Sequence, residues 1–320
     1  MSVSVPAHES EALGAAILAY GGGRSFEAVI DSLLAAELDP AAIVLVHNPA
    51  RSGEVAPTAP AGIEVVATGR NLGYAGGMNV GIERLRGRGV NLLLLLTHDA
   101  ALRPGALPSL VAAMHDDPAL GVVGPVLLLS GGDAAYSYGG MTSRSGLNQH
   151  RKLPPSLDFA EVATCDWIDG GTMLVRDEVL ASVGGFDERF WSYCEEADLC
   201  LRVRRAGWGV GVVLAARADQ EPGAVKRPGV WAYLMTRNGV EYGRRATGLS
   251  GLIGSLLRAN RATALAVGRA TVRRLGLRPG PWREPWSLAV GAARGQIDFA
   301  RRRWGPPPAD LPGSGDVGNV

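Results

Sequence analysis

The sequence of 320 residues has few cysteines and no long apolar run. Its three cysteines, Cys165, Cys194 and Cys200, include no CxxC pair, and their number is odd. We therefore expect no disulfide framework and a reducing, cytoplasmic location. No uncharged apolar run approaches the roughly 18 residues that a membrane-spanning helix needs. No basic segment followed by an apolar run begins the chain, so we expect no signal peptide.

Lysine is also scarce, because only Lys152 and Lys226 occur and the other basic side chains are arginine. Residues 1–222 carry 16 basic and 26 acidic side chains, whereas residues 223–305 carry 16 basic and 3 acidic ones. Such asymmetry indicates that the two parts face different partners. A basic helical tail suits anionic lipid or a phosphorylated substrate. No nucleic-acid motif accompanies the charge, so we expect no nucleic-acid partner.

Apolar residues are abundant, at 47%, together with 44 glycines and 20 prolines. This composition suits a loop-rich α/β protein with one large or two small domains. Apolar runs typical of buried strands alternate with helical periodicity, which predicts a parallel sheet covered on both faces. We expect strands at 13–20, 42–47, 63–67, 91–96 and 122–129, helices at 25–37, 76–86 and 104–115, and a long loop or hairpin over the site at 130–165.

The most distinctive stretch is residues 186–200, FDERFWSYCEEADLC, which follow Gly184-Gly185. Aromatic residues precede three carboxylates, Glu195, Glu196 and Asp198, at the start of an amphipathic helix. Acidic residues complement the dipole at a helix N-terminus, so a helix start with ion pairs is one explanation. The glycines and aromatics packed around the acids favour a functional site instead.

A second motif lies at residues 71–81, NLGYAGGMNVG. The two motifs resemble, in the same order, the donor-side and acceptor-side motifs of family 2 inverting glycosyltransferases with the GT-A fold. The similarity is greatest to the rhamnosyltransferase-like and galactofuranosyltransferase-like branch, and it covers about residues 13–245. The resemblance implies an α/β GT-A fold, with a mostly parallel, Rossmann-like sheet, helices on both faces and additional C-terminal helices.

Five regions are expected along the chain. A disordered leader at 1–11 precedes a catalytic domain at 12–222, with a nucleotide-sugar half at 12–105 and an acceptor half at 106–222. A basic helical region follows at 223–304, and a Pro- and Gly-rich disordered tail at 305–320.

The resemblance implies an enzyme that transfers a sugar from a dTDP- or UDP-linked donor, with inversion, to a hydroxyl of a glycan, lipid-linked or natural-product acceptor. Inverting transfer needs one general base for the acceptor hydroxyl and stabilisation of the departing diphosphate. By resemblance Glu196 is the base, and Glu195 and Asp198 orient the loop or bind acceptor hydroxyls. Neighbouring carboxylates raise one another's pKa, which suits a base that works near neutral pH.

Thr97-His98-Asp99 stands where this family places its DxD metal motif, at the end of a predicted strand. A hard cation such as Mg²⁺ or Mn²⁺ needs oxygen ligands there, and Asp99 is the single predicted metal ligand. Gln220 stands near the place of a late His, and His47 near the place of an Asp beside the nucleobase. The residues expected to bind the donor are Tyr20, Asn48, Arg70, Asn71, Gly73, Tyr74, Gly77, Asn79, His98 and Asp99.

On the acceptor side the resemblance points to Asp169, Gly170, Trp191 and Tyr193. Asp169 precedes a glycine, so a turn-forming role explains it equally well.

The basic C-terminal part contains two predicted amphipathic helices, at 251–275 and 286–304. Residues 231–238 resemble the aromatic-rich Arg-Asn segment that follows the catalytic domain in this family. Three uses fit the helices: peripheral contact with the inner membrane face through 249–304, packing on the catalytic domain, or a homodimer interface.

Two other functions remain open from the sequence. A sugar nucleotidyltransferase would use Gly21-Gly22-Gly23-Arg24 as a phosphate loop, but a strand-to-helix turn also explains these residues. A catalytically weak, sugar-nucleotide-binding relative would explain the incomplete DxD motif, whereas the acidic set at Glu195, Glu196 and Asp198 argues for an enzyme.

Overall fold

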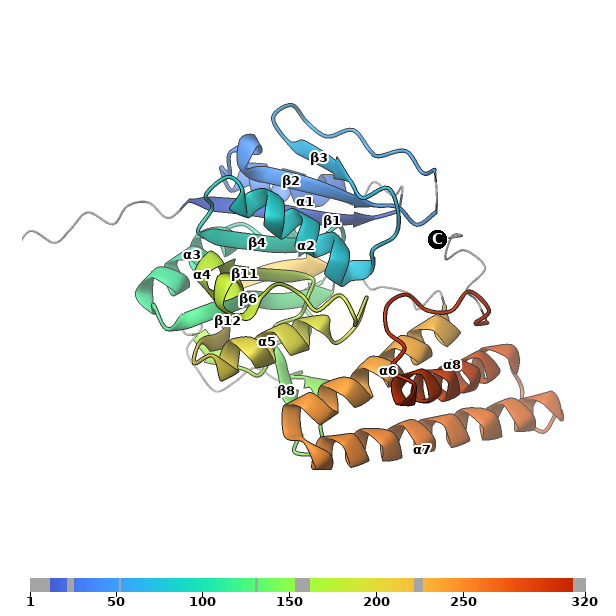
Figure 1. The fold of residues 1–320 in the computed structure, drawn as a ribbon. Coiled ribbons are helices and arrows are strands. Elements are labelled where there is room, and N and C mark those ends of the chain that lie inside the picture. The colour runs from blue at the N-terminus through green and yellow to red at the C-terminus, as the bar shows by residue number, and fades with distance from the viewer. Residues whose placement is uncertain are drawn as a thin grey trace, which may run out of the picture.

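The computed structural model describes residues 12–21, 26–51, 53–129, 132–152, 162–221 and 227–312. Within these residues ten strands form one sheet (Figure 1). The strands are β1 (Leu13–Tyr20), β2 (Ile43–Asn48), β3 (Glu64–Ala67), β4 (Leu92–Thr97), β5 (Ala100–Leu102), β6 (Leu120–Leu129), β7 (Ala135–Ser137), β10 (Val162–Thr164), β11 (Thr172–Arg176) and β12 (Gly209–Gln220).

The sheet is mixed. Its order is β10-β12-β6-β11-β4-β1-β2-β3, with β5 beside β12 and β7 beside β6. β1 is parallel to β2 and β4, and β2 to β3, as the alternation of strands and helices predicts. β11 instead runs antiparallel between β4 and β6. No crossover helix lies in the described chain between β6 and β11, and a parallel return needs such a crossover.

Helices cover both faces of the sheet. α2, α4 and α5 pack on one face, and α1 and α3 on the other. In β4, Leu93 and Leu95 face the first layer while Leu92, Leu94 and Leu96 face the second. This double burial explains the continuous leucine run and confirms the predicted α/β fold class. The helices are α1 (Phe26–Ala35), the short 3₁₀ helix η1 (Pro40–Ala42), α2 (Gly73–Arg86), α3 (Ala106–Asp116), α4 (Asp177–Val183), α5 (Glu195–Arg205), α6 (Pro228–Thr247), α7 (Leu249–Arg274) and α8 (Arg283–Ala300).

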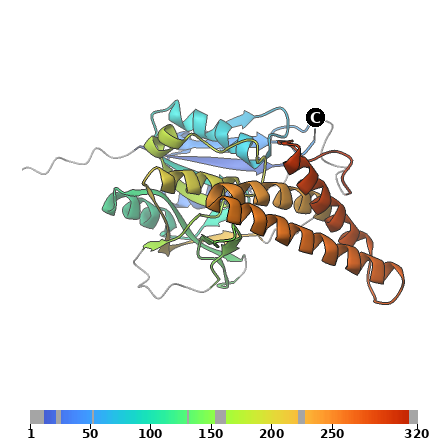
Figure 2. The ribbon, with the colours of Figure 1, turned by 60° about the horizontal axis from the view of Figure 1, so that its bottom comes forward.

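The last three helices pack on one another beside the sheet (Figures 1 and 2). α6 and α7 approach so closely that a Cβ on Gly251 would meet the Gly243 carbonyl oxygen at 1.9 Å. Part of the expected disordered tail is packed, because Leu311 is buried against Val230 and Leu234 of α6. The expected leader at 1–11 and residues 313–320 lie outside the described residues.

The segment expected to lie over the site contains a hairpin, β8 (Gly140–Thr142) and β9 (Asn148–His150). Its turn packs on the C-terminal helices, since Arg258 of α7 donates from Nη1 to the Ser145 carbonyl at 3.0 Å. Residues 130, 131 and 153–161 of this segment lie outside the described part of the chain. None of the described helices is both long and apolar enough to cross a membrane.

Candidate active site

The carboxyl ends of β1, β2 and β4 meet at one edge of the sheet. Tyr20 is in register with Asn48, and the N–H of His98 donates to the Leu18 carbonyl at 3.1 Å. Three predicted strand-end residues, Tyr20, Asn48 and Asp99, therefore share this edge. Ligands bind at the carboxyl edge in open α/β sheets.

Asn48 and Asn71 hold the turn that leads into α2. Asn48 Oδ1 accepts from the Leu72 N–H at 2.8 Å, and its Nδ2 donates to the Gly73 carbonyl at 3.0 Å. Asn71 Oδ1 accepts from the Gly73 N–H at 2.9 Å. Asn48 is 2% exposed, so its amide shapes the donor-side turn from within the protein. Arg70 is exposed at the rim of this turn.

The start of α2 lies directly against residue 191. The Ala75 N–H donates to the Trp191 carbonyl at 3.1 Å. Gly73 has φ +71°, and a Cβ there would meet the same carbonyl oxygen at 2.2 Å, so only glycine fits. Tyr74 donates from its hydroxyl to the Gly170 carbonyl at 2.7 Å. The predicted donor and acceptor segments are therefore in direct contact.

Asn79 makes a second junction between the two motifs. Its Nδ2 donates to the Phe186 carbonyl at 2.9 Å and to Glu188 Oε1 at 3.0 Å, while its Oδ1 accepts from the Phe186 N–H at 2.9 Å. Asn79 thus links the donor-side motif to the acceptor-side motif within the protein. Gly77 packs α2 on β1, since a Cβ there would meet Leu18 Cδ1 at 2.6 Å.

The loop before α5 has an unusual backbone. Trp191, Tyr193 and Cys194 have φ of +65°, +69° and +70°. Left-handed conformations cost non-glycine residues about 1–3 kcal/mol each and concentrate at functional sites. Tyr193 is 41% exposed, in contrast to the buried Cys194. The strained loop ends at Glu195, the first residue of α5.

Glu195 and Glu196 stand at this helix start in different environments. Glu195 is 4% exposed, and its Oε2 has no hydrogen-bond partner among the described residues. Burial, followed by the charge of Glu196, raises the pKa of Glu195 well above its ordinary range. Burial, followed by the charge of Asp169, raises the pKa of Glu196 to about 7. The pair can therefore carry one proton near neutral pH.

Asp169 is held beside the acidic pair by its own turn. Its Oδ1 accepts from the Gly171 N–H at 3.0 Å, and its Oδ2 lies 3.7 Å from Nδ1 of His150. Burial is the main cause of its raised pKa. The turn-forming explanation and a role beside Glu196 hold together, because the carboxylate that forms the turn also raises the pKa of Glu196.

Asp198 has structural partners. It is 0% exposed, and it pairs with Arg202 Nε at 2.9 Å and with Arg245 Nη1 at 2.7 Å. Both carboxylate oxygens are thereby occupied. Of the two roles expected for Asp198, this geometry favours orientation of the loop over contact with an acceptor.

The predicted metal motif, Thr97-His98-Asp99, offers few side chains that could bind a cation. Among the described residues no three His, Cys, Asp or Glu side chains gather as a metal site. Gln220 lies beside the motif, because it pairs with Ala100 across β12 and β5, and its buried Oε1 has no partner in the described structure. Asp99 and Gln220 fit a cation only if a bound diphosphate supplies most of the oxygens, as is common for Mg²⁺ at nucleotide sites.

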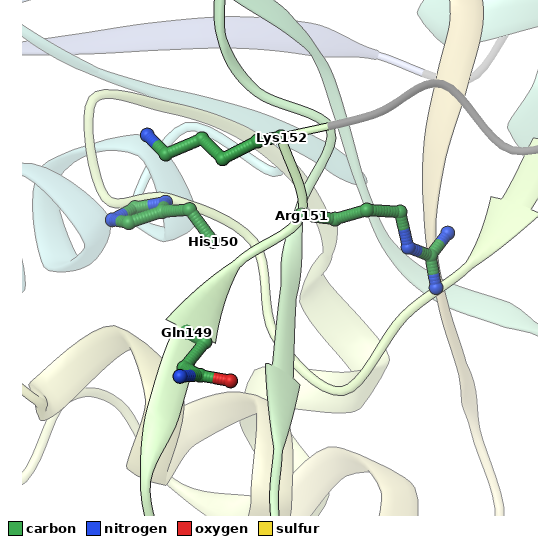
Figure 3. Close-up of a pocket in the computed structure, with 4 residues that line it drawn as sticks. All are labelled: Gln149, His150, Arg151 and Lys152. Carbon is green, nitrogen blue, oxygen red and sulfur yellow. The ribbon is translucent and has the colours of Figure 1, made fainter.

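Two hollows flank the strand ends. One, of about 560 Å³, is lined by Gln149, His150, Arg151 and Lys152 (Figure 3). His150 and Lys152 point to one side there, whereas Arg151 points away. The other, of about 550 Å³, follows β2 and is lined by Ala50, Arg51, Gly53 and Glu54. The buried His47 lies 3.9 Å from Glu54 Oε1.

Three residues near the site, His150, Arg237 and Asn238, were not among the predicted site residues. His150 comes from the hairpin, and no local pattern distinguishes it from a solvent-facing histidine. Arg237 and Asn238 of α6 contact the loop before Glu195. Their resemblance to the family's Arg-Asn segment marked their position but not their contacts.

Residues 15–178 match the family model described as Glycosyl transferase family 2. The chain belongs to this family. It is therefore a glycosyltransferase, which transfers a sugar from a nucleotide sugar. The match confirms the predicted family and supports an enzyme.

Relatives of this family 2 member include rhamnosyltransferases. N-acetylglucosaminyl-diphospho-decaprenol L-rhamnosyltransferase of Mycobacterium tuberculosis is 26% identical over 222 residues, which are 62% of this chain and 72% of the relative. Rhamnosyltransferase WbbL of Escherichia coli K12 is 40% identical over 62 residues, or 19% of this chain and 23% of the relative. The predicted rhamnosyltransferase-like resemblance is confirmed.

The fold is that of GT-A glycosyltransferases. The crystal structure of GalNAc-T7 with UDP, GalNAc and Mn²⁺ superposes with a TM-score of 0.57 at 14% identity. The alignment covers 73% of this chain and 48% of that structure, so the chain spans about half its length.

Proposed function

We propose that this glycosyltransferase transfers the sugar of a dTDP- or UDP-linked donor, with inversion, to a hydroxyl of a glycan or lipid-linked acceptor. Glu196 is the general base. The observation that carries this proposal is the contact of the donor and acceptor motifs beside the helix start that bears Glu196. Burial there raises the pKa of Glu196 to about 7. A base whose pKa lies near the working pH combines ionisation with proton affinity.

Glu195 has a complementary role in this proposal. Burial, followed by the charge of Glu196, raises the pKa of Glu195 well above its ordinary range, which favours a protonated carboxyl that donates a hydrogen bond where Glu196 accepts one. Two carboxyl groups with separated pKa values divide donor and acceptor roles in this way. Asp169 and Tyr193 complete the acceptor side, where Tyr193 offers an exposed ring.

On the donor side, Asp99 would hold a divalent cation together with the two phosphates of the donor. The chemistry that the cation supplies is neutralisation of the charge that develops on the departing diphosphate. Tyr20, His98 and the turn shaped by Asn48 and Asn71 border the same strand edge. This supports binding of the nucleotide beside β1 and β2.

The test is a donor panel with a defined acceptor. Purified protein is incubated with dTDP-rhamnose, UDP-galactofuranose and UDP-glucose, each with a short-chain polyprenyl-diphosphate N-acetylglucosamine, and the anomeric configuration of the product is determined by NMR. Transfer from a dTDP or UDP donor with inversion is expected. A product with retained configuration, or transfer only from a GDP donor added to the panel, contradicts the proposal.

Peripheral membrane contact is part of the proposal, and α7 is its most favourable element. Leu249, Leu257 and Leu265 are 70%, 65% and 51% exposed, and Arg261 and Arg269 are exposed on the same helix. Figures 1 and 2 show α7 on the outer side of the helical layer. Exposed apolar residues interleaved with arginine suit the surface of an anionic bilayer.

Vesicle flotation tests this contact. The protein is mixed with phosphatidylglycerol-rich vesicles or with neutral phosphatidylcholine vesicles. We expect the wild type to bind the anionic vesicles. We expect Leu257→Asp and Arg261→Glu to weaken this binding. If these variants float as the wild type does, α7 is not the membrane contact, and a dimer measured by sedimentation would assign the apolar side chains to a second copy.

A further inference from the structure

The loop at residues 189–194, here the acidic-motif loop, carries three left-handed non-glycine residues immediately before the acids. Such a backbone persists only where surrounding contacts fix it. Within the loop the Ser192 N–H donates to the Phe190 carbonyl at 2.8 Å, and the N–H groups of Phe190 and Trp191 donate to the Asp187 and Glu188 carbonyls at 3.1 Å. The Arg189 and Trp191 carbonyls accept from the N–H groups of Gly305 and Ala75, each at 3.1 Å. The carbonyls of Ser192 and Tyr193 need donors from side chains.

Asn238 of α6 supplies these donors through the two N–H bonds of its amide. Its Nδ2 lies 2.8 Å from each of three carbonyl oxygens, those of Phe190, Ser192 and Tyr193. Its Oδ1 accepts from Arg237 Nε at 2.9 Å, which fixes the orientation of the amide. Asn238 is 0% exposed, so these contacts lie away from bulk water.

Arg237 adds a second set of contacts to the same loop. Its Nη2 donates to the Phe190 carbonyl at 3.0 Å, and its Nη1 donates to the Gly305 carbonyl at 2.8 Å. The guanidinium is 0% exposed and lies over the Tyr233 and Trp304 rings at 5.1 and 5.7 Å. Burying the charge of Arg237 costs free energy, because its partners are mainly neutral carbonyl groups. The guanidinium therefore depends on these particular contacts.

We propose that Arg237 and Asn238 are positioning residues, which hold the acidic-motif loop in the conformation that aims Glu195 and Glu196 into the site. The catalytic consequence rests on the proposed role of Glu196, whereas the loop conformation does not. The rival explanation is that the two side chains only fasten α6 to the catalytic domain. The rival predicts a loss of stability with no change in the environment of Glu196.

The geometry separates the two explanations through the pH dependence of transfer. If the loop relaxes, Glu196 gains water and moves from its neighbours, so the pH at which transfer is half-maximal falls. A loss of folded protein lowers the rate at every pH alike. The ionisable groups that face Glu196 are Glu195, Cys194 and Cys200 of its own helix region, Asp169, Tyr74 of α2, Tyr136 of β7, and Tyr193.

The experiment uses the full chain with Asn238→Ala, Arg237→Lys and a control, Gly243→Ala. The control crowds α6 against α7, because its Cβ meets Ser255 Oγ at 2.3 Å, but it removes no donor from the loop. Amide hydrogen exchange is measured on peptides that span residues 189–196. Steady-state transfer is measured against pH with the donor and acceptor that the wild type uses.

In Asn238→Ala we expect faster amide hydrogen exchange in residues 189–196 and a kcat lower by about 10²-fold. The acidic limb of its pH profile should lie at lower pH than in the wild type. Arg237→Lys should retain part of each property, while Gly243→Ala leaves the exchange of this loop and the pH limb unchanged. The proposal is overturned if Asn238→Ala and Gly243→Ala change hydrogen exchange and the pH profile equally. It is also overturned if hydrogen exchange of the loop is unchanged in both Asn238→Ala and Arg237→Lys. If Asn238→Ala does not fold, Arg237→Lys decides by the same readouts. If the wild type transfers no sugar, the proposed function fails, and hydrogen exchange still tests the positioning.

Discussion

Asn79 and Phe186 exchange two hydrogen bonds across 107 residues of chain, each 2.9 Å long. One residue belongs to the donor-side motif and the other to the acceptor-side motif. The pair therefore fixes the distance between the nucleotide edge and the acidic helix start. Ala75 and Trp191 make a second link at 3.1 Å.

Replacing Asn79 should uncouple these motifs. Asn79→Ala leaves the Phe186 N–H and carbonyl without side-chain partners, so we expect a loss of about 2 kcal/mol of stability and a lower kcat at saturating donor. Chemical denaturation and transfer kinetics measure both. Asn91→Ala is the control, because within the described part of the chain Asn91 Oδ1 accepts from the Ala12 N–H at an exposed site. Equal kinetic losses in the two variants contradict the coupling.

The pH dependence of transfer should report Glu196. The base works when ionised, so kcat/KM, which reports the ligand-free enzyme, rises with pH through about 7, and at pH 6 it should be about a tenth of its plateau. The negative charge of Asp169 raises this pKa, so Asp169→Asn should move the acidic limb to lower pH. Asp166→Asn is the control, since Asp166 pairs with Arg204 at 2.7 Å. If the acidic limb of the pH profile lies at the same pH in Asp169→Asn as in the wild type, the assignment of Glu196 as the base is contradicted.

Stability should change with pH in the opposite sense. The folded pKa of Glu196 lies above its ordinary value of 4.5, so the native state binds more protons, and stability falls as pH rises from 4.5 to about 7. Glu196→Gln removes this cost. We expect the variant to be more stable than the wild type at pH 8 by on the order of 1 kcal/mol, or about 2 °C in Tm. The gain should shrink toward pH 5, and the exposed Glu188→Gln should show no such trend in thermal scans.

Asp99 should determine the effect of metal on nucleotide binding. Calorimetric titration with dTDP and UDP, with and without Mn²⁺, should show that the cation tightens wild-type binding by about tenfold or more. Asp99→Asn should lose this gain and bind as the wild type does in EDTA, whereas Asp116→Asn at the exposed end of α3 keeps it. If Mn²⁺ tightens nucleotide binding to Asp99→Asn as much as to the wild type, the cation does not bind at Asp99.

The elements that the sequence predicts well are those whose cause is local. The alternating burial of Leu92 to Leu96 on two faces gives a continuous apolar run, and the acidic first turn of α5 follows a helix-start pattern. The antiparallel β11 was not predictable, because its pairing depends on β4 and β6, far along the chain.

The residues of the site also divide into those that a local pattern predicts and those that depend on distant contacts. Glu195, Glu196 and Asp169 were predicted from the resemblance to the family's motifs, and in the structure their charges act on one another. Asn48, Asn71 and Asn79 lie where expected but bind the protein's own backbone, which spacing alone cannot reveal. Asn238 acts through three carbonyl groups of a loop some 45 residues away, so no local pattern encodes its contacts.

The measurement that tests the account most directly is sugar transfer by Glu196→Gln at pH 8, alongside its affinity for dTDP and UDP. The account predicts that kcat falls by about 10²–10⁴-fold, while nucleotide affinity stays at the wild-type value because the donor edge is untouched. Glu188→Gln, the same chemical change within the acidic motif, should retain transfer. A Glu196→Gln enzyme that transfers sugar within about tenfold of the wild type would contradict the assignment of Glu196 as the base.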